Sequence, residues 1–332
     1  MSMKLPSNAI AVAVLATLVV GGLTFLPRSR ADDLCRYDPR PPKPVPQRQV
    51  DNLGAIENSV DELARTYGAD KVLIAFDIDN TLLTAASDFG SDAWFKWQDA
   101  ILARPGCGAE RVAADFGGLL EVQYLAYSIG DMRPTQSDTA QVIKRLVGAG
   151  HGVIALTARG PDIRTPTVRE LGANGIAFTT APPCRAGRAD EASLCIRRGF
   201  IAAETILGVA EAALTESERK MLGPDPRPIS YADGVMMVSG QNKGLMLRLL
   251  LASSPSTFEA IVFVDDGADN VIDVEQAFAG DETPRAVGFW YTAFEEANAA
   301  FYNDATRLDA TVQAWQTLRS ALCKSVGTYC AR

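Results

Sequence analysis

The sequence predicts an α/β protein with a three-layer, Rossmann-like parallel sheet. Three apolar runs, at 71–77, 153–158 and 260–266, lack the polar alternation of a half-exposed strand and resemble strands that are buried on both faces. Helix-like segments separate these runs, which is typical of a parallel sheet covered by helices on both sides. Each run ends in polar residues, and ligands bind at the carboxyl ends of such strands.

Length and charge limit the class of protein. The chain has 332 residues, enough for one large domain or two small ones, and 47% of them are hydrophobic, which allows a substantial core. The formal net charge is −8. Nucleic acid carries charge of the same sign, so we expect no nucleic-acid partner.

The first 31 residues predict a secretory signal peptide. Lys4 gives a positive start, Ala9–Leu26 is almost wholly apolar, and Ser29 and Ala31 occupy the small-residue positions of a cleavage site. An uncleaved membrane anchor is the alternative, because an apolar segment of 18 residues can just span a bilayer. We therefore expect an exported, periplasmic protein, attached to a membrane only through residues 9–26 if these remain.

A proline-rich linker at 32–49 precedes the folded body at 50–332. Five prolines within 37–48 are typical of an extended, semi-rigid spacer. Periodicity then predicts, in chain order, an amphipathic helix at 50–67, a strand at 71–77, a mostly helical stretch at 92–149, apolar strands at 153–158 and 175–180, and an irregular and helical stretch at 181–226.

The second half of the chain continues the alternation of strands and helices. Residues 229–238 predict a hairpin, because Asp233-Gly234 is a typical two-residue turn between apolar strands. A helix at 243–253, buried strands at 260–266 and 286–291, and helices at 293–302 and 306–322 follow.

The six cysteines suggest disulfide bonds, because they follow an export segment. The pairs Cys184–Cys195 and Cys323–Cys330 are plausible because their members are close in sequence. Six cysteines allow fifteen connectivities, so the pairing stays open.

Polar residues at the strand ends predict a binding site. The first strand ends in Asp77-Ile78-Asp79-Asn80-Thr81, the second in Thr157-Ala158-Arg159, and the strand at 260–266 in Asp265-Asp266, while Lys243 begins a helix. These ends meet at one edge of a parallel sheet, so several carboxylates would share one crevice. A bound hard cation would offset their repulsion, and Mg²⁺ prefers such oxygen ligands together with phosphate.

Each of these residues also has a structural interpretation. Aspartates near Asn or Gly are common in turns and helix caps, a threonine often ends a strand, and a lysine is usually a solvated surface charge. Their joint appearance at strand ends argues against that interpretation for all of them. A calcium loop beginning at Asp77 is rejected, because Leu82 stands where such a loop needs glycine and a strand precedes it.

The only histidine, His151, argues against two other classes of site. One histidine excludes a histidine-based zinc site, and its place before a strand puts it far from the ligand-binding edge, which argues against a Ser-His-Asp triad. The surrounding “GAGHG”, 148–152, lies between a helix and a strand, the reverse of the order in a dinucleotide fingerprint. We expect a surface turn there.

Four segments in order resemble the motifs of the haloacid dehalogenase superfamily of phosphotransferases: “FDIDNT”, “LTAR”, “NKG” and “FVDDGADN”. The resemblance covers about residues 70–290. The whole chain is most similar to a bacterial family within it, domain of unknown function 2608, and also resembles exported acid phosphatases. The resemblance implies a haloacid dehalogenase-like hydrolase domain at 50–332, with a mainly helical cap at about 88–133 and a second insertion at about 181–226.

The resemblance also implies roles for the polar residues. Asp77 would be the nucleophile and Asp79 the general acid and base. Thr157, the backbone at Ala158, and Lys243 would hold the phosphoryl group. Mg²⁺ would be held by Asp77, the carbonyl of Asp79 and Asp266, with Asp265 in place of a frequent glycine as a further candidate. Asp269 and Asn270 would orient these ligands.

The expected function is that of an exported, magnesium-dependent phosphatase that acts on a small phosphorylated substrate. Phosphoryl transfer to an alcohol and a catalytically silent binding protein are the alternatives. Four aromatic residues of the predicted cap are open to two interpretations, as the cap's own core or as a substrate wall. They are Trp94, Trp97, Tyr124 and Tyr127.

Overall fold

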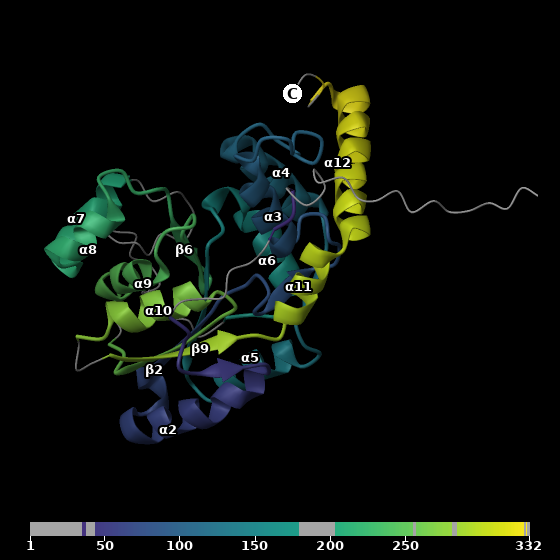
Figure 1. The fold of residues 1–332 in the computed structure, drawn as a ribbon. Helices are drawn as coiled ribbons and strands as arrows, with labels where there is room; N and C mark the ends of the chain where they lie inside the picture. Colours follow the sequence, from purple (N-terminus) through teal and green to yellow (C-terminus); the bar gives the residue numbers. More distant parts are fainter. Residues whose placement is uncertain are drawn as a thin grey trace, which may run out of the picture.

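The computed structural model describes residues 35–37, 44–178, 203–254, 257–280, 284–328 and 330. Within these ranges a central sheet of seven strands has the order β1-β9-β8-β2-β5-β7-β6, and every pairing except β6 with β7 is parallel. The predicted α/β fold is confirmed (Figure 1). The strands are β1 (Gln49–Val50), β2 (Val72–Phe76), β5 (Gly152–Thr157), β6 (Ser230–Ala232), β7 (Val235–Met237), β8 (Ala260–Asp265) and β9 (Arg285–Tyr291).

Helices cover both faces of this sheet, as the continuous apolar strands require. In β2, Val72, Ile74 and Phe76 join a core formed with one set of helices, while Leu73 and Ala75 join a core on the opposite face. All five are buried, so the strand has no solvated side. The first set contains α2 (Glu57–Tyr67), α5 (Thr139–Gly148) and α6 (Arg164–Ala173), and the second contains α7 (Ala203–Ala213), α9 (Lys243–Ala252) and α10 (Ala268–Ala277).

The register of the three central strands aligns their carboxyl ends. Phe76 pairs with Ala155 on β5 and with Val264 on β8. Asp77 therefore leaves the sheet beside the ends of both neighbouring strands. This places Thr157 and Asp265 at the same edge as Asp77.

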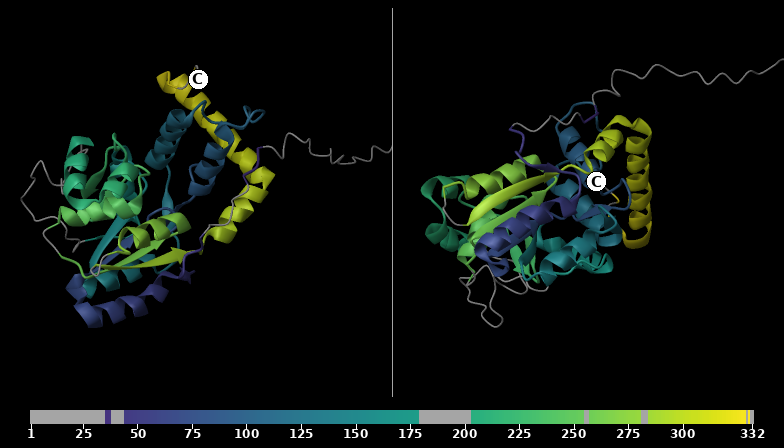
Figure 2. Two further views of the ribbon diagram at one scale, coloured as in Figure 1. Left: turned by 60° about the vertical axis from the view of Figure 1, so that its left-hand side comes forward. Right: turned by 90° about the horizontal axis from the view of Figure 1, so that it is seen from below.

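A second, smaller body of structure covers that edge. A two-stranded antiparallel pair, β3 (Leu83–Ala85) and β4 (Met132–Pro134), leads to and from α3 (Asp92–Leu102) and α4 (Phe116–Ile129). The C-terminal helices α11 (Glu295–Asn303) and α12 (Ala305–Val326) pack against α3 and α4, as the two views in Figure 2 show. Trp94 and Trp97 lie in this shared core, to which Leu308, Val312 and Trp315 of α12 also contribute.

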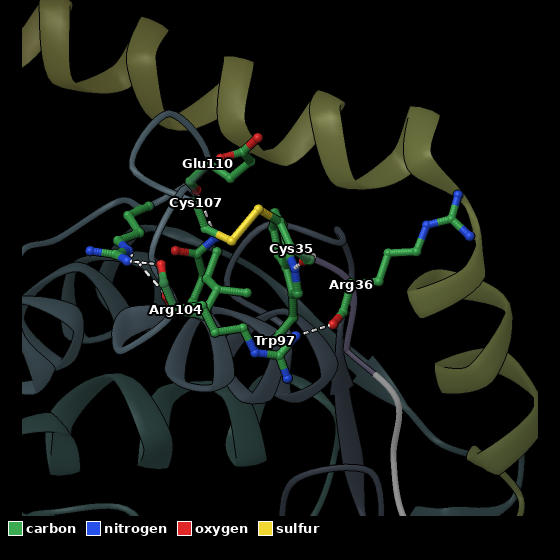
Figure 3. Close-up of a disulfide and its surroundings, with 9 residues drawn as sticks. Cys35, Arg36, Trp97, Arg104, Cys107 and Glu110 are labelled. Atoms are coloured by element: carbon green, nitrogen blue, oxygen red, sulfur yellow. Dashed lines mark hydrogen bonds between the residues drawn. A yellow bond between two sulfur atoms is a disulfide. The ribbon is translucent and has the colours of Figure 1, made fainter. Parts of the chain in front are cut away.

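Two disulfides lie within the described residues. Cys35–Cys107 joins the segment before β1 to the loop between α3 and α4, and the indole of Trp97 donates to the carbonyl of Cys35 at 2.7 Å (Figure 3). Cys323–Cys330 confirms one of the two suggested pairs. The other suggested pair, Cys184–Cys195, lies outside the described residues. Disulfides fit a protein of an oxidising compartment outside the cytoplasm.

Most of the remaining predicted elements are confirmed. The hairpin turns at Asp233 and Gly234, both with positive φ, as a two-residue hairpin loop requires. The expected helix at 50–67 begins with a short 3₁₀ turn at Leu53–Ile56, and α8 (Glu216–Leu222) follows α7. No helix within the described ranges is both long and apolar enough to cross a membrane. Residues 9–26 lie outside those ranges.

Two expectations are wrong. The described part of 175–180 is not a strand: Ile176 and Phe178 are buried in the core without sheet pairing, because β7 occupies the place beside β5. His151 is not a surface residue. It is buried, and its Nδ1 lies 3.0 Å from the carbonyl oxygen of Ala69, since the 3₁₀ turn at Ala69–Lys71 packs over the start of β5.

Candidate active site

Asp77 is buried at the carboxyl end of β2. Its N–H donates to the carbonyl of Val264 at 2.9 Å, which continues the sheet pairing by one residue. Burial raises the pKa of Asp77, Lys243 opposes this, and the carboxylates of Asp265 and Asp79 raise it further, to about 7. A charged Asp77 therefore needs additional positive charge nearby.

Lys243 supplies part of that charge. Its Nζ lies 2.7 Å from Asp77 Oδ1 and 2.6 Å from Asp265 Oδ2, and the side chain is buried. Although burial alone would lower it, the two carboxylates raise the pKa of Lys243 well above its ordinary value. The amine is therefore a fixed cation, held at the first turn of α9 where Asn242 caps the helix.

Both carboxylate oxygens of Asp265 accept hydrogen bonds from neighbouring groups. Besides Lys243, it accepts from the N–H of Gly267 at 2.7 Å and from Asn270 Nδ2 at 3.0 Å, both through Oδ1. Its placement suits a residue that orients Lys243. The expected supporting place of Asn270 agrees with this geometry, whereas Asp269 is exposed on α10 and is not brought to the site.

Asp266 is held by the turn that follows Asp77. Its N–H donates to Thr81 Oγ1 at 3.0 Å, and its Oδ2 accepts from Asn80 Nδ2 at 3.4 Å. Asn80 adopts a positive φ of 55°, which asparagine tolerates better than most residues, and is buried. The loop after β2 and the loop after β8 are thereby fixed to each other.

Asp79 is clamped by an arginine and a tyrosine. Arg159 donates Nε to Asp79 Oδ2 at 2.9 Å and Nη2 to Oδ1 at 2.8 Å, and the Tyr127 hydroxyl donates to Oδ1 at 3.2 Å. The guanidinium also lies 3.9 Å from the Tyr127 ring centroid. Burial works to raise the pKa of Asp79, but the charge and hydrogen bonds of Arg159, with that of Tyr127, lower it overall.

Thr157 and Ala158 lie at the end of β5, as the sequence predicts. Thr157 is fully buried, and its Oγ1 accepts from the N–H of Arg159 at 3.2 Å, which leaves the hydroxyl proton available. Ala158 is exposed, and its carbonyl accepts from the N–H of Gly240 at 2.7 Å. The loop after β7 thus supports the turn after β5.

Three carboxylates fit the needs of a hard divalent cation. Ligand oxygens of Asp77, Asp265 and Asp266 all lie within 4.8 Å of one another. Asp77 Oδ1 is buried, and among the described residues it has the ion pair with Lys243 at 2.7 Å and no further polar partner. An oxygen-only, anionic donor set with room for a further cationic partner at Asp77 is suited to Mg²⁺. Asp77 and Asp266 are the better placed ligands, because both oxygens of Asp265 already accept hydrogen bonds from Lys243, Gly267 and Asn270.

Sequence reasoning missed Lys96 altogether, and it missed the contacts that Asn80, Tyr127 and Arg159 make in this site. Arg159 and Asn80 belong to motifs that were recognised, but nothing in their spacing shows that they reach Asp79 and Asp266. Lys96 and Tyr127 come from α3 and α4, and only the folded position of these helices brings them to the site. Of the aromatic residues considered for a substrate wall, Tyr127 lies at the site and contacts Asp79, whereas Trp94 and Trp97 are core residues.

Comparison with known proteins gives one family. Neither the curated proteins nor the solved structures include a match to the chain. The model of a family described as “Protein of unknown function (DUF2608)” matches residues 49–325, which include the whole described sheet and both helices of the smaller body. The chain belongs to this family.

Proposed function

We propose that the protein is an exported, magnesium-dependent phosphatase that hydrolyses phosphate monoesters through an aspartyl phosphate on Asp77. The observation that carries this proposal is the placement of Asp77 against Lys243, in a cluster of carboxylates suited to a cation, with Asp79 two residues away. The four ordered motifs of the haloacid dehalogenase superfamily support the same reaction.

Asp77 would act as the nucleophile. One of its oxygens attacks phosphorus, the bond from phosphorus to the ester oxygen breaks, and the leaving group departs with the electron pair. Lys243, together with Thr157 and the backbone after β5, would bind the phosphoryl oxygens and offset their charge. Mg²⁺ held by Asp77, Asp266 and the carbonyl of Asp79 would supply further positive charge when bound.

Asp79 would then serve as the base that releases phosphate. Arg159 and Tyr127 keep it ionised and fixed in direction, so it can take a proton from the water that attacks phosphorus. The bond from phosphorus to Asp77 breaks, and free phosphate leaves. To act first as an acid toward the leaving group, Asp79 must gain a proton, which Arg159 opposes.

Turnover of p-nitrophenyl phosphate by the purified protein tests this function. We expect hydrolysis that requires Mg²⁺, is lost on chelation and is lost in Asp77→Asn, because an amide cannot attack. Nitrophenol release that exceeds phosphate release when glycerol is added would favour transfer to an alcohol. A folded, metal-loaded protein with no turnover of a panel of phosphate esters would favour a silent binding protein.

A further inference from the structure

A lysine on α3, one of the helices that cover the sheet edge, reaches the carboxylate cluster of Asp77, Asp265 and Asp266. Lys96, on α3, places its Nζ 2.7 Å from Asp92 Oδ2 and 3.9 Å from Asp266 Oδ2. Asn80 links the same two oxygens, donating to Asp92 at 3.1 Å and to Asp266 at 3.4 Å. The contacts of Lys96 and Asn80 therefore meet at Asp266, one of the two carboxylates that are better placed to bind a metal.

The ammonium is held at this place but can move. The Lys96 side chain is 44% exposed, whereas that of Asp266 is 14% exposed. Asp92 lies one turn before Lys96 on the same helix and is fixed by Asn80, so it keeps the ammonium at the edge of the cluster. Lys96 can thus lose its contact with Asp266 without leaving the site.

We propose that Lys96 competes with the metal for Asp266, and that a bound phosphate relieves this competition, so that metal and phosphate bind cooperatively. A divalent cation at Asp266 repels the ammonium and removes its second carboxylate. A phosphate dianion beside the cation restores a negative partner for Lys96. Lys96 therefore disfavours the metal alone and favours the metal together with phosphate.

This inference rests on the proposed function for its choice of ligands. It goes further, because it assigns to the covering helices a residue that couples the two ligands. By linkage, the factor by which phosphate strengthens metal binding equals the factor by which metal strengthens phosphate binding. Lys96 should account for a measurable part of that factor.

Isothermal titration of Mg²⁺ into the metal-free protein, with and without inorganic phosphate, tests the coupling. We expect Lys96→Met to bind Mg²⁺ about tenfold more tightly than wild type when phosphate is absent, a change of about 1.4 kcal/mol. Phosphate should then strengthen Mg²⁺ binding about tenfold less in this variant than in wild type. Lys96→Arg keeps the charge and should behave as wild type.

Lys220→Met is the matched control. Lys220 also pairs with an acidic residue one turn earlier, Glu216 at 2.8 Å, but it lies on α8 away from the carboxylate cluster. This variant should leave both titrations unchanged. Equal Mg²⁺ affinity in wild type and Lys96→Met without phosphate, or unchanged coupling, overturns the inference, as does the absence of Mg²⁺ binding in both proteins.

Turnover separates the two proposals. Hydrolysis of p-nitrophenyl phosphate by wild type, with titrations of Lys96→Met that match wild type, overturns the inference and leaves the phosphatase standing. Tighter Mg²⁺ binding and weaker coupling in Lys96→Met, without hydrolysis by wild type, supports the inference and overturns the phosphatase.

Discussion

At the scale of single residues, Asp77 and Asp79 are two positions apart but have opposite surroundings. Burial and neighbouring carboxylates raise the pKa of Asp77 to about 7. The Arg159 guanidinium, against the effect of burial, lowers that of Asp79. Two carboxyl groups with pKa values driven apart are typical of sites where they have different chemical roles.

The raised pKa predicts how Asp77→Asn changes stability in metal-free buffer. The pKa of folded Asp77 lies above its unfolded value of 3.8, so the contribution of Asp77 to stability decreases as the pH rises from about 4 to about 7. Asn stays neutral. At pH 8 the variant should be more stable than wild type by at most roughly 4 kcal/mol, at about 1.4 kcal/mol per pKa unit. Near pH 4 the two should be similar.

Urea unfolding with a chelator present, at pH 4 and at pH 8, measures this difference. Asp79→Asn is the control, because it leaves the buried Arg159 without its carboxylate and should destabilise the protein at pH 8. A stability difference between Asp77→Asn and wild type that does not change with pH would show that Asp77 is not held at a raised pKa.

A second prediction concerns the role of Asp79 with different leaving groups. Asp79→Asn should slow steady-state hydrolysis of an alkyl phosphate by about 10²–10⁴-fold, the usual range for lost acid–base catalysis. A nitrophenolate departs without a proton, so the first step on p-nitrophenyl phosphate should be nearly spared. Stopped-flow measurement should show a burst of about one equivalent of nitrophenol per enzyme, then a slow phase.

Tyr127→Phe provides the comparison for Asp79→Asn. It removes one hydrogen bond to the Asp79 carboxylate and leaves both contacts from Arg159, so its turnover should decrease by about ten- to a hundredfold, in line with one hydrogen bond to a charged group. Equal loss of the burst and of the steady state in Asp79→Asn, with Mg²⁺ affinity unchanged, would argue for a purely structural Asp79.

At the scale of helices and strands, α9 and α10 position Lys243 through a close contact. A Cβ on Gly244 would overlap the carbonyl oxygen of Asp273 and lie 2.8 Å from Ala277 Cβ. Only glycine allows this approach, and the residue before it is Lys243. The short distance between the two helices thus sets the place of the amine in the carboxylate cluster.

Gly244→Ala should therefore destabilise the protein by about 1–3 kcal/mol, as overpacking of a core usually does, and should reduce turnover by moving Lys243. Gly208 on α7 is the matched control, because nothing lies within 4 Å of its added Cβ. Gly208→Ala should be neutral or stabilising by up to about 1 kcal/mol, since alanine favours a helix. Thermal unfolding and p-nitrophenyl phosphate assays compare them, and equal effects of the two variants would contradict the packing argument.

Of the two described disulfides, Cys35–Cys107 is predicted to contribute more to the stability of the folded protein. It joins residues 72 positions apart, whereas Cys323–Cys330 joins residues only 7 apart near the end of α12. Replacing Cys35 and Cys107 by alanine should cost about 4 kcal/mol in the chain-entropy description, and replacing Cys323 and Cys330 clearly less. Urea unfolding measures both, and an equal or reversed order would contradict this assignment.

Local sequence patterns determine some parts of the site and of the sheet but not others. Sequence reasoning could place Asp77, Thr157 and Asp265, because each ends or directly follows an apolar strand and parallel strands end at one edge. Lys243 was predictable because it begins a helix. The contact between Arg159 and Asp79 depends on rotamers and on packing across 80 residues, which no local pattern encodes. The expected strand at 175–180 failed because an apolar run cannot show whether a sheet position is already taken by another strand.

At the scale of the whole molecule, segments from both sides of the central sheet in the sequence pack together in the smaller body of structure. Helices α11 and α12 pack on α3 and α4, and Cys35, before the first strand, is bonded to the loop between α3 and α4. Three segments far apart in sequence thus build the cover over the carboxylate cluster. Local periodicity predicts the helices, but it cannot predict that Cys35 and the helices α11 and α12 meet at α3 and α4.

Mass spectrometry of acid-quenched protein shows whether Asp77 carries the phosphoryl group during turnover. Asp79→Asn should slow hydrolysis of the intermediate, so this variant with Mg²⁺ and p-nitrophenyl phosphate should gain the mass of one phosphoryl group, located by peptide fragmentation to Asp77. The double variant with Asp77→Asn should gain none. Turnover by wild type, with no phosphoryl group on Asp77 in the quenched variant, would show that Asp77 is not the nucleophile.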